Sequence, residues 1–469
     1  MTDGVPEKPT IPADRARTGA FQADPRQALT RTLRRIYDLG LTTTSGGNLS
    51  VVDSEGTLWI TPAGCDKGRL RPDQIIPLER SGRAQRAADG RASTAPAIRP
   101  SSELPFHRAV YAVRPDVRAI VHAHPVSIVA FSLIGQAPDT RVSARWHATC
   151  GRVGWAAYAR PGSDALGRRI ADSFREGADC VVLENHGVVI GGRTLRQAFE
   201  RLESLDLCAR ALLHARNLAR ECPLAEEELA LHDRKADPRA PEHIPDRPAT
   251  DEEASLRHGL CALAKRAREK RLMTSCDGIL SARRSNGSFL LTPAALPRAG
   301  PEPADLLCLD LGGRTTAGSA DPAEAALHRA LYLAHPEVRA ILHGFPEHAS
   351  GFSVAGLPLP SRTIPESYLV IRDPASIAYR TSRTDPGEVA QQIGPETPTA
   401  LIRNDGVLVL GRDLLDAFDR LEVLEATAAA VLSSRLLGEL RPLTEDQLGD
   451  LREAFFPLGG FGGTRDPEP

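Results

Sequence analysis

Hydrophobic positions recur at helical spacing in some stretches of the chain and alternate with polar positions in others. A helical pattern begins near Pro25 and stops at Gly40. Two short alternating stretches, 48–52 and 57–61, predict strands on either side of a polar turn. Further on, the patterns predict helices over 103–113, 127–133 and 195–218 and a strand over 118–122. The first half of the chain therefore mixes short strands with helices of different lengths.

The second half of the chain repeats the first. Residues 108–125 and 329–346 share ten identities in eighteen positions at an offset of 221 residues (343 − 122). Upstream of the polar stretch 80–100, the offset is 231 (292 − 61), so the first copy is ten residues longer there. That stretch is low in apolar residues and predicts a loop. An internal duplication explains the repeat.

Composition suggests where the two copies begin and end. At 41% hydrophobic and 25% charged residues, the chain is an ordinary globular protein with enough apolar residues for two buried cores. The predicted units are a disordered tail over 1–24, a first domain over 25–221, a linker rich in proline and charge over 222–250, a second domain over 251–441, and a C-terminal tail over 442–469.

Composition also excludes several classes of protein. No apolar run approaches the length of about eighteen residues that a membrane span requires, and proline and aspartate near the N-terminus do not fit a secretory signal. The eight cysteines form no Cys-x-x-Cys pair, which fits reduced thiols in the cytoplasm. A net charge of −2 gives no reason to expect nucleic acid or a membrane as partner. Only five of the 58 basic residues are lysine, so single arginines are weak evidence for phosphate binding.

Candidate metal ligands stand out in the first copy. His122 and His124 alternate on a predicted apolar strand, and residues i and i+2 of a strand point to the same side, so both imidazoles can chelate one ion. His186 follows another apolar stretch in a turn from which a third ligand can approach. Three neutral imidazoles with an open position are typical of a catalytic zinc-type site. Taken alone, a His-x-His pair is more often part of a core or a loop.

A carboxylate and several small polar groups accompany the histidines. Glu103 begins a predicted helix with Ser101 or Ser102 as its cap, and it is a candidate acid or base, although a glutamate there also suits the helix dipole. Each of the small groups is also an ordinary turn signal. The groups that can bind an anion are Gly47, Asn48, Thr61, Gly64, Ser101 and Ser102.

Five motifs in this order resemble the class II aldolase/adducin family. They are SGGNLS (45–50), TPAG (61–64), SSELPFH (101–107), HAHP (122–125) and NHG (185–187). The resemblance covers residues 25–221 closely and 251–437 as a degenerate copy. It implies an α/β fold of two three-layer domains, each with a central, largely antiparallel sheet flanked by helices. It also implies a homo-oligomer, a dimer that forms a pseudo-tetrameric ring with sites between subunits.

The resemblance also assigns roles to single residues. His122, His124 and His186 match the metal-binding histidines, with Zn²⁺ as the expected ion and Fe²⁺ or Mn²⁺ as alternatives. Glu103 matches the catalytic acid or base. The family's tyrosine proton donor falls near 145–147, where this chain has Arg-Trp-His and no tyrosine. The positions that match the phosphate pocket are Gly47, Asn48, Ser101 and Ser102, with Thr61 and Gly64 nearby.

The expected activity follows from these roles. A divalent ion would act as a Lewis acid that stabilises an enediolate, and Glu103 would carry the proton. We therefore expect a metal-dependent lyase of the aldolase, dehydratase or epimerase type, which acts on a small hydroxylated carbonyl compound or sugar phosphate. One alternative is a non-haem iron oxygenase on the same three histidines, and the other is a non-catalytic scaffold like the adducins.

The second copy keeps some of these residues and loses others. Glu324 and His343 stand where Glu103 and His122 stand in the first copy. The remaining equivalents of His124, His186 and Asn48 are Phe345, Asp405 and Ile279. One histidine and an aspartate make a weak metal site, so the second copy is predicted to be a structural pseudo-domain that walls the active site of the first.

Overall fold

A computed structural model gives the arrangement of most of the chain. It describes residues 24–78, 98–218, 220–232, 250–293, 300–315 and 320–455. The expected N-terminal tail and the expected loop at 80–100 lie outside the described residues, apart from residue 24 and residues 98–100. Residues 233–249 of the expected linker and 456–469 of the expected C-terminal tail also lie outside them.

The first repeat contains one seven-stranded sheet in the order β3-β2-β1-β4-β7-β6-β5. All neighbouring pairs are antiparallel except β5 and β6. Its helices are α1 (Pro25–Asp38), α2 (Leu104–Val113), α3 (Val126–Leu133), α4 (Ala144–Cys150), α5 (Asp164–Arg175) and α6 (Leu195–Asn217). Its strands are β1 (Asn48–Val52), β2 (Leu58–Ile60), β3 (Ile76–Leu78), β4 (Ala119–Ala123), β5 (Val153–Ala156), β6 (Cys180–Leu183) and β7 (Gly187–Gly192).

Helices cover both faces of this sheet. On one face α2 and α5 pack together, and their apolar side chains form a core with Ile120 and Val189 of the central strands. On the other face lie α1, α3 and α6, whose residues pack against Val121 and Ile190. Every residue of β4 is buried because the strand lies at the centre of the sheet with helices on both sides. Alternate side chains of one strand therefore enter different cores.

The second repeat has the same topology, with the sheet order β10-β9-β8-β11-β14-β13-β12 and one parallel pair, β12 and β13. Its helices are α8 (Asp251–Glu269), α9 (Pro322–Ala334), α10 (Glu347–Ala355), α11 (Pro365–Val370), α12 (Tyr379–Thr384), α13 (Pro386–Gln392) and α14 (Leu414–Ser434). Its strands are β8 (Ile279–Arg283), β9 (Phe289–Leu291), β10 (Leu307–Leu309), β11 (Ala340–Gly344), β12 (Ala375–Ile377), β13 (Thr399–Ile402) and β14 (Val407–Gly411). The predicted pair of α/β domains, each with a largely antiparallel central sheet, is thus confirmed.

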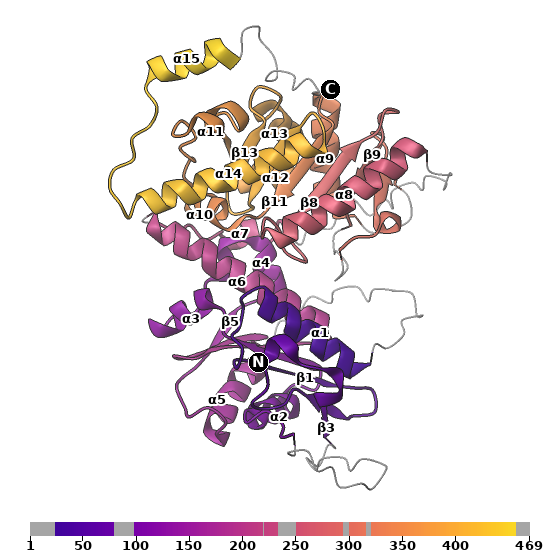
Figure 1. The fold of residues 1–469 in the computed structure, drawn as a ribbon, viewed down its shortest axis with the longest axis vertical. Coiled ribbons are helices and arrows are strands. Elements are labelled where there is room, and N and C mark those ends of the chain that lie inside the picture. Colours follow the sequence, from indigo (N-terminus) through magenta and orange to yellow (C-terminus); the bar gives the residue numbers. More distant parts are fainter. Residues whose placement is uncertain are drawn as a thin grey trace, which may run out of the picture.

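The two repeats meet along α6 and α10, near the middle of Figure 1. One hydrophobic core runs through this junction and contains residues of both repeats, such as Leu212 and Phe352. The start of the expected linker also packs here, because α7 (Glu226–Leu229) and its neighbours bury three leucines against Ala144 and Tyr379. After the second repeat, the helix α15 (Glu445–Phe455) contacts α11.

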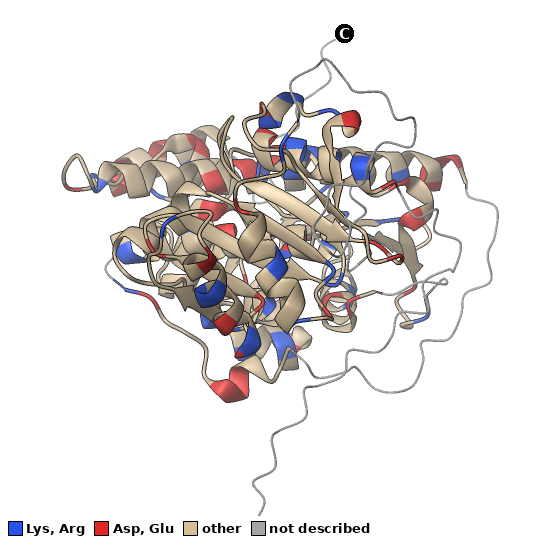
Figure 2. Cartoon of the chain, turned by 90° about the horizontal axis from the view of Figure 1, so that it is seen from below, with Lys and Arg blue, Asp and Glu red and all other residues tan. Residues whose placement is uncertain are grey.

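Charge is spread evenly over the fold. Figure 2 shows basic and acidic residues interspersed along the chain rather than separated, in keeping with the net charge of −2. Among the described residues, none of the helices is both long enough and apolar enough to cross a bilayer.

Candidate metal centre

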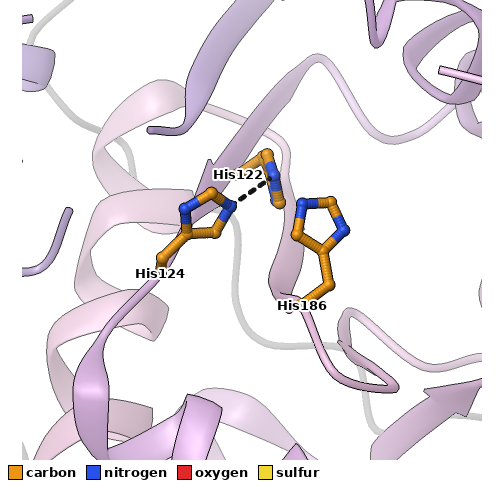
Figure 3. Close-up of side chains that lie close together, drawn as sticks. All are labelled: His122, His124 and His186. Carbon is orange, nitrogen blue, oxygen red and sulfur yellow. Dashed lines mark hydrogen bonds between the residues drawn. The ribbon is translucent and has the colours of Figure 1, made fainter. Parts of the chain in front are cut away.

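The three predicted histidines lie together at one end of the central strands. His122 is on β4, His124 directly follows that strand, and His186 lies in the turn between β6 and β7. One ligand nitrogen from each ring lies within 4.8 Å of the other two. His124 Nε2 is 3.0 Å from His122 Nε2, and the ring centroids are 4.7 to 5.0 Å apart. Figure 3 shows the three rings arranged around a common space.

Glycines allow neighbouring loops to approach these histidines closely. A Cβ on Gly46 would lie 2.8 Å from His124 Nδ1, and one on Gly187 would lie 2.5 Å from His124 Cδ2. Gly47 has a positive φ of +70°, and a Cβ there would lie 2.6 Å from the carbonyl oxygen of His122. Any larger residue at these positions would push the histidines apart, so the glycines of the SGGN and NHG motifs shape the site.

The ring of His122 is held in one orientation. Its Nδ1 lies 3.0 Å from the carbonyl oxygen of Val188, to which it donates a hydrogen bond. This leaves Nε2 facing His124 and Glu103. A ligand histidine whose second nitrogen is fixed by a carbonyl is typical of metal sites in proteins.

The protonation states of His124 and His186 suit a metal. Burial and then the neighbouring His122 lower the pKa of His124 to about 3 and that of His186 to about 4, so both rings are neutral at pH 7. A neutral imidazole offers a lone pair to a cation. Although burial acts to lower the pKa of His122, Glu103 raises it above its usual value, so an ion would displace a proton from this ring on binding. With that exchange, the three imidazole nitrogens fit a divalent ion.

Glu103 lies against the histidines with one oxygen engaged and one open. Its Oε2 accepts a hydrogen bond of 2.8 Å from Asn48 Nδ2 and lies 3.1 Å from His122 Nε2. Its Oε1 lies 3.8 Å from His186 Nε2 and is buried, with no hydrogen-bond partner among the described residues. Burial acts to raise the pKa of Glu103, but the charges and hydrogen bonds of His122, the charge of His186 and the hydrogen bond from Asn48 together hold it below its usual range.

The prediction that Ser101 or Ser102 caps the helix α2 is wrong. Glu103 itself occupies the N-cap position of α2, and its side chain makes no capping hydrogen bond. Ser101 Oγ instead accepts a hydrogen bond of 3.3 Å from the Glu103 backbone nitrogen. The carboxylate is thus free to turn toward the histidines rather than back onto its own helix.

A buried chain of polar side chains orients Asn48. Burial lowers the pKa of His107 to about 3, so its ring is neutral, and its Nε2 lies 2.5 Å from Asn48 Oδ1. Its Nδ1 lies 2.7 Å from Ser50 Oγ, which contacts Tyr111 at 2.8 Å. Because Nε2 can only donate to the amide oxygen of Asn48, the amide nitrogen must face Glu103. Sequence reasoning did not single out His107, although it stands within the SSELPFH motif.

Two of the predicted anion-binding side chains, Thr61 and Asn48, already have hydrogen-bond partners within the protein. Thr61 Oγ1 accepts a hydrogen bond from the Leu49 nitrogen, and Thr292 makes the same bond to Leu280 in the second repeat. Because this bond persists in the copy without the histidine set, we assign a structural role to the Thr61 side chain. Asn48 is likewise engaged, by Glu103.

Of the remaining predicted groups, Ser101 and Gly64 belong to two segments that meet beside a buried lysine. Ser101 N donates to the carbonyl of Thr61, which ties Ser101 and the exposed Ser102 to the turn containing Gly64. Lys67, which the sequence analysis did not single out, is only 3% exposed, and its Nζ donates to the carbonyl of Pro62 in this turn. Lys67 is one of only five lysines among 58 basic residues, and this rarity is the feature of the sequence that could have drawn attention to it.

The tripeptide at the family's tyrosine position lies at the junction with the second repeat. It belongs to α4, where His147 Nδ1 lies 3.0 Å from Thr140 Oγ1. Arg145, on the same helix, enters the second repeat and is 8% exposed. Its Nε lies 2.9 Å from Asp405 Oδ1, and its Nη2 contacts Glu324.

The second repeat therefore holds a guanidinium where the first holds three nitrogen ligands. Glu324, His343 and Asp405 bring their ligand atoms within 4.8 Å of one another, a grouping closer to a metal site than the sequence indicated. Arg145 contacts both carboxylates, and Arg383 lies 3.6 Å from Glu324. A cation is thus already built into this position.

Both repeats match one family of known proteins. The family model described as "Class II Aldolase and Adducin N-terminal domain" matches residues 27–213 and 258–432. A 5-methylthioribulose-1-phosphate/5-deoxyribulose-1-phosphate aldolase of Rhodospirillum rubrum is 35% identical over 180 residues, which are 37% of this chain and 74% of that protein. A 3-oxo-tetronate 4-phosphate decarboxylase of Pectobacterium atrosepticum is 30% identical over 181 residues, 38% of this chain and 78% of that protein. A solved L-fuculose 1-phosphate aldolase is 29% identical, with a TM-score of 0.40 and coverage of 45% of this chain and 94% of that one.

Proposed function

The chain belongs to the class II aldolase and adducin family, and on this premise we propose that its first repeat is a metal-dependent lyase acting on a small hydroxylated carbonyl or sugar-phosphate substrate. The observation that carries the proposal is the convergence of three imidazoles beside a carboxylate with one open oxygen. Similar proteins are named as aldolases and decarboxylases of phosphorylated compounds, which supports a lyase. The cysteine pattern supports the cytoplasm as its location.

His122, His124 and His186 would hold the ion, which we propose to be Zn²⁺. When bound, a divalent ion supplies Lewis-acid chemistry toward a carbonyl oxygen. Imidazole also suits Fe²⁺, and Mn²⁺ is a further alternative. Metal analysis of the protein purified without added metal decides between these ions, and oxygen-dependent turnover with iron would contradict the lyase.

Glu103 is the residue that would move the proton. Asn48 fixes Oε2, so Oε1 is the atom available to a substrate. The carboxylate is ionised before substrate binds, because its neighbours hold its pKa low. Glu103 would therefore first act as a base and return the proton later in the cycle, within hydrogen-bond reach of the reacting atom.

An anionic group on the substrate has a place beside the metal. The ammonium of Lys67 is buried near the turn that contains Gly64, and Gly47, Ser101 and Ser102 lie at the adjoining segments. A buried positive charge favours an anion such as phosphate or carboxylate. We propose that these groups bind the phosphate of the substrate, with Asn48 and Thr61 holding the surrounding loops.

Replacing Glu103 with glutamine is expected to lower kcat by about 10²–10⁴-fold while the protein keeps its metal. Glutamine has nearly the same shape and can still interact with Asn48, but it cannot accept a proton. Turnover is measured on a panel of phosphorylated ketoses and 2-hydroxy carbonyl compounds, with metal content determined on the same sample. Wild-type kcat in this variant would remove Glu103 from the proton-transfer step.

We further propose that two chains assemble into a pseudo-fourfold ring. Within one chain, α10 buries Val354 and Ala355, which are 1% and 0% exposed, at the junction with the first repeat. At the offset of 221 (354 − 133), their equivalents are Leu133, the last residue of α3, and Ile134, which follows it; they are 63% and 59% exposed. The first repeat thus leaves uncovered the face that the second repeat uses for packing, and an equivalent surface of another chain would cover it.

Contact between the second repeat of one chain and the first repeat of its partner would also complete the metal centre. Arg145 of the first repeat reaches the equivalent site in the second, and its own equivalent at the offset of 221 (366 − 145) is Glu366 on α11. Tyr368 follows two residues later, at the position equivalent to His147. In the ring, α11 of one chain would reach the histidine site of its partner, and Tyr368 is our candidate for the family's tyrosine.

This arrangement predicts that two inactive variants restore activity when mixed. One carries His124→Ala, and the other carries Glu366→Ala together with Tyr368→Phe. A mixed dimer would contain one intact site, built from the histidines of the second variant and α11 of the first. After the chains are unfolded together and refolded, we expect about a quarter of the wild-type activity. Leu133→Glu in both chains should abolish the recovery, and a mixture that stays inactive while dimeric would contradict the shared site.

A further inference from the structure

A second group of potential metal ligands lies at the junction of the two repeats. His214 is on α6, and Glu347 and His348 begin α10. One ligand atom from each residue lies within 4.8 Å of the other two, the same spread as in the histidine site of the first repeat. All three side chains are partly exposed, so an ion can reach them from solvent.

Close packing of two helices creates this group. A Cβ on Gly351 of α10 would lie only 2.4 Å from the Cβ of His214 on α6. The glycine therefore allows α6 and α10 to approach at this point. The rings of His214 and His348 consequently lie 4.4 Å apart, centroid to centroid.

The ligand atoms are held in position by other residues. Glu425 on α14 accepts hydrogen bonds from the His348 backbone nitrogen at 3.0 Å and from His348 Nδ1 at 2.7 Å, which leaves Nε2 of this ring open. Arg210 binds Glu347 Oε2 at 3.1 Å, and Glu347 Oε1 faces His348 Nε2 at 3.7 Å. A histidine oriented by a carboxylate on its other nitrogen is the arrangement that metal ligands commonly have.

We propose that His214, Glu347 and His348 form a second metal site, for a borderline divalent ion such as Zn²⁺, that joins the two repeats. Two imidazoles and one carboxylate are a recognised zinc ligand set. One ligand comes from the first repeat and two from the second. An ion bound to all three stabilises the junction because separation of α6 from α10 would break the site.

This site is specific to the junction within one chain. At the interface proposed between chains, the equivalent positions are Ser433 (214 + 219), Val126 (347 − 221) and Ser127 (348 − 221). Valine and serine do not bind Zn²⁺ as these residues would. The proposal therefore adds one ion per chain, and it stands independently of the activity proposed for the first repeat.

Metal stoichiometry tests the proposal. Full-length protein is stripped with a chelator, loaded with Co²⁺ or Zn²⁺ and desalted, and metal is measured by elemental analysis with the Co²⁺ absorption spectrum as a second readout. We expect about two equivalents in the wild type, about one in His124→Ala, about one in His214→Ala, and none in the double variant. Glu347→Gln, which preserves the side-chain shape, provides a second route if His214→Ala fails to fold. His258→Ala, at an exposed histidine on α8, is the control and should keep both equivalents.

Thermal unfolding supplies an independent readout. In the His124→Ala background, added Zn²⁺ should raise the melting temperature, and this rise should vanish when His214→Ala or Glu347→Gln is added. A wild type with a single equivalent that disappears in His124→Ala would overturn the second site and leave the first intact. Two equivalents retained in both His214→Ala and Glu347→Gln would also overturn it.

Discussion

Replacing His124 with alanine is expected to empty the first-repeat metal site and to reduce turnover by about a thousandfold or more. Two imidazoles would remain, and His122 Nε2 would lose the neighbour that now lies 3.0 Å away. A Lewis-acid metal contributes several kcal/mol to transition-state stabilisation, and each ~1.4 kcal/mol corresponds to a tenfold change in rate. The loss of one ligand therefore affects both occupancy and catalysis.

Metal content and kcat/KM, measured on the same preparation, check this result. His124 makes no part of the hydrophobic cores, so the melting temperature of the metal-free protein should change little. His258→Ala again serves as the matched control, because this ring is exposed and its Nδ1 lies 2.7 Å from the carbonyl oxygen of Ala254 on its own helix. The variant that combines His124→Ala with His214→Ala should bind no metal. If it kept one equivalent, His124 would be excluded as a ligand.

The periodic parts of this fold could be predicted from the sequence. The alternating stretches at 48–52 and 57–61 correspond to β1 and β2, and the long amphipathic stretch from Leu195 corresponds to α6. The two histidines of the HAHP motif meet because they are two residues apart at the end of one strand. These features depend on neighbours in the sequence, so local patterns were sufficient to find them.

The supporting residues of the site were harder to predict. Asn48 and Thr61 were predicted as anion-binding groups, and the sequence did not show that their side chains also bind Glu103 and the Leu49 backbone. His107 stands within a recognised motif, yet its role depends on Ser50, which is 57 residues away in the sequence. No local pattern shows which polar group a buried side chain will meet across a sheet.

Arg145 was missed for a related reason. The chain has so many arginines relative to lysines that each one carries little information by composition. What distinguishes Arg145 is its burial in the other repeat, 260 residues away from its partner Asp405. The damaged motif of the second copy predicted the loss of two histidines, but not that the first copy would supply the replacement cation.

Replacing Arg145 with alanine is expected to destabilise the protein by about 3–5 kcal/mol, because Glu324 and Asp405 would remain as buried carboxylates without their main partner. Arg383 would remain near them, but its contacts of 3.6 and 3.9 Å are longer than the 2.9 Å contact of Arg145 with Asp405. Urea unfolding at pH 7, followed by circular dichroism, measures the loss. Arg71→Ala removes an exposed ion pair with Asp73 and should change the free energy of unfolding far less.

The pH dependence and a compensated variant identify the cause. Although burial acts to raise the pKa of Glu324, His343 and Arg145 hold it well below its usual range. A carboxylate whose pKa is lowered by folding stabilises the folded state at pH values above its pKa in the unfolded chain. This contribution is lost as the pH falls through the lower pKa of the folded state. The difference in the free energy of unfolding between wild type and Arg145→Ala should therefore shrink as the pH drops below about 4.

Adding Glu324→Gln and Asp405→Asn to Arg145→Met should recover most of the stability at pH 7. If the loss in Arg145→Ala matched that of Arg71→Ala, the guanidinium could not be the cation on which the second repeat depends.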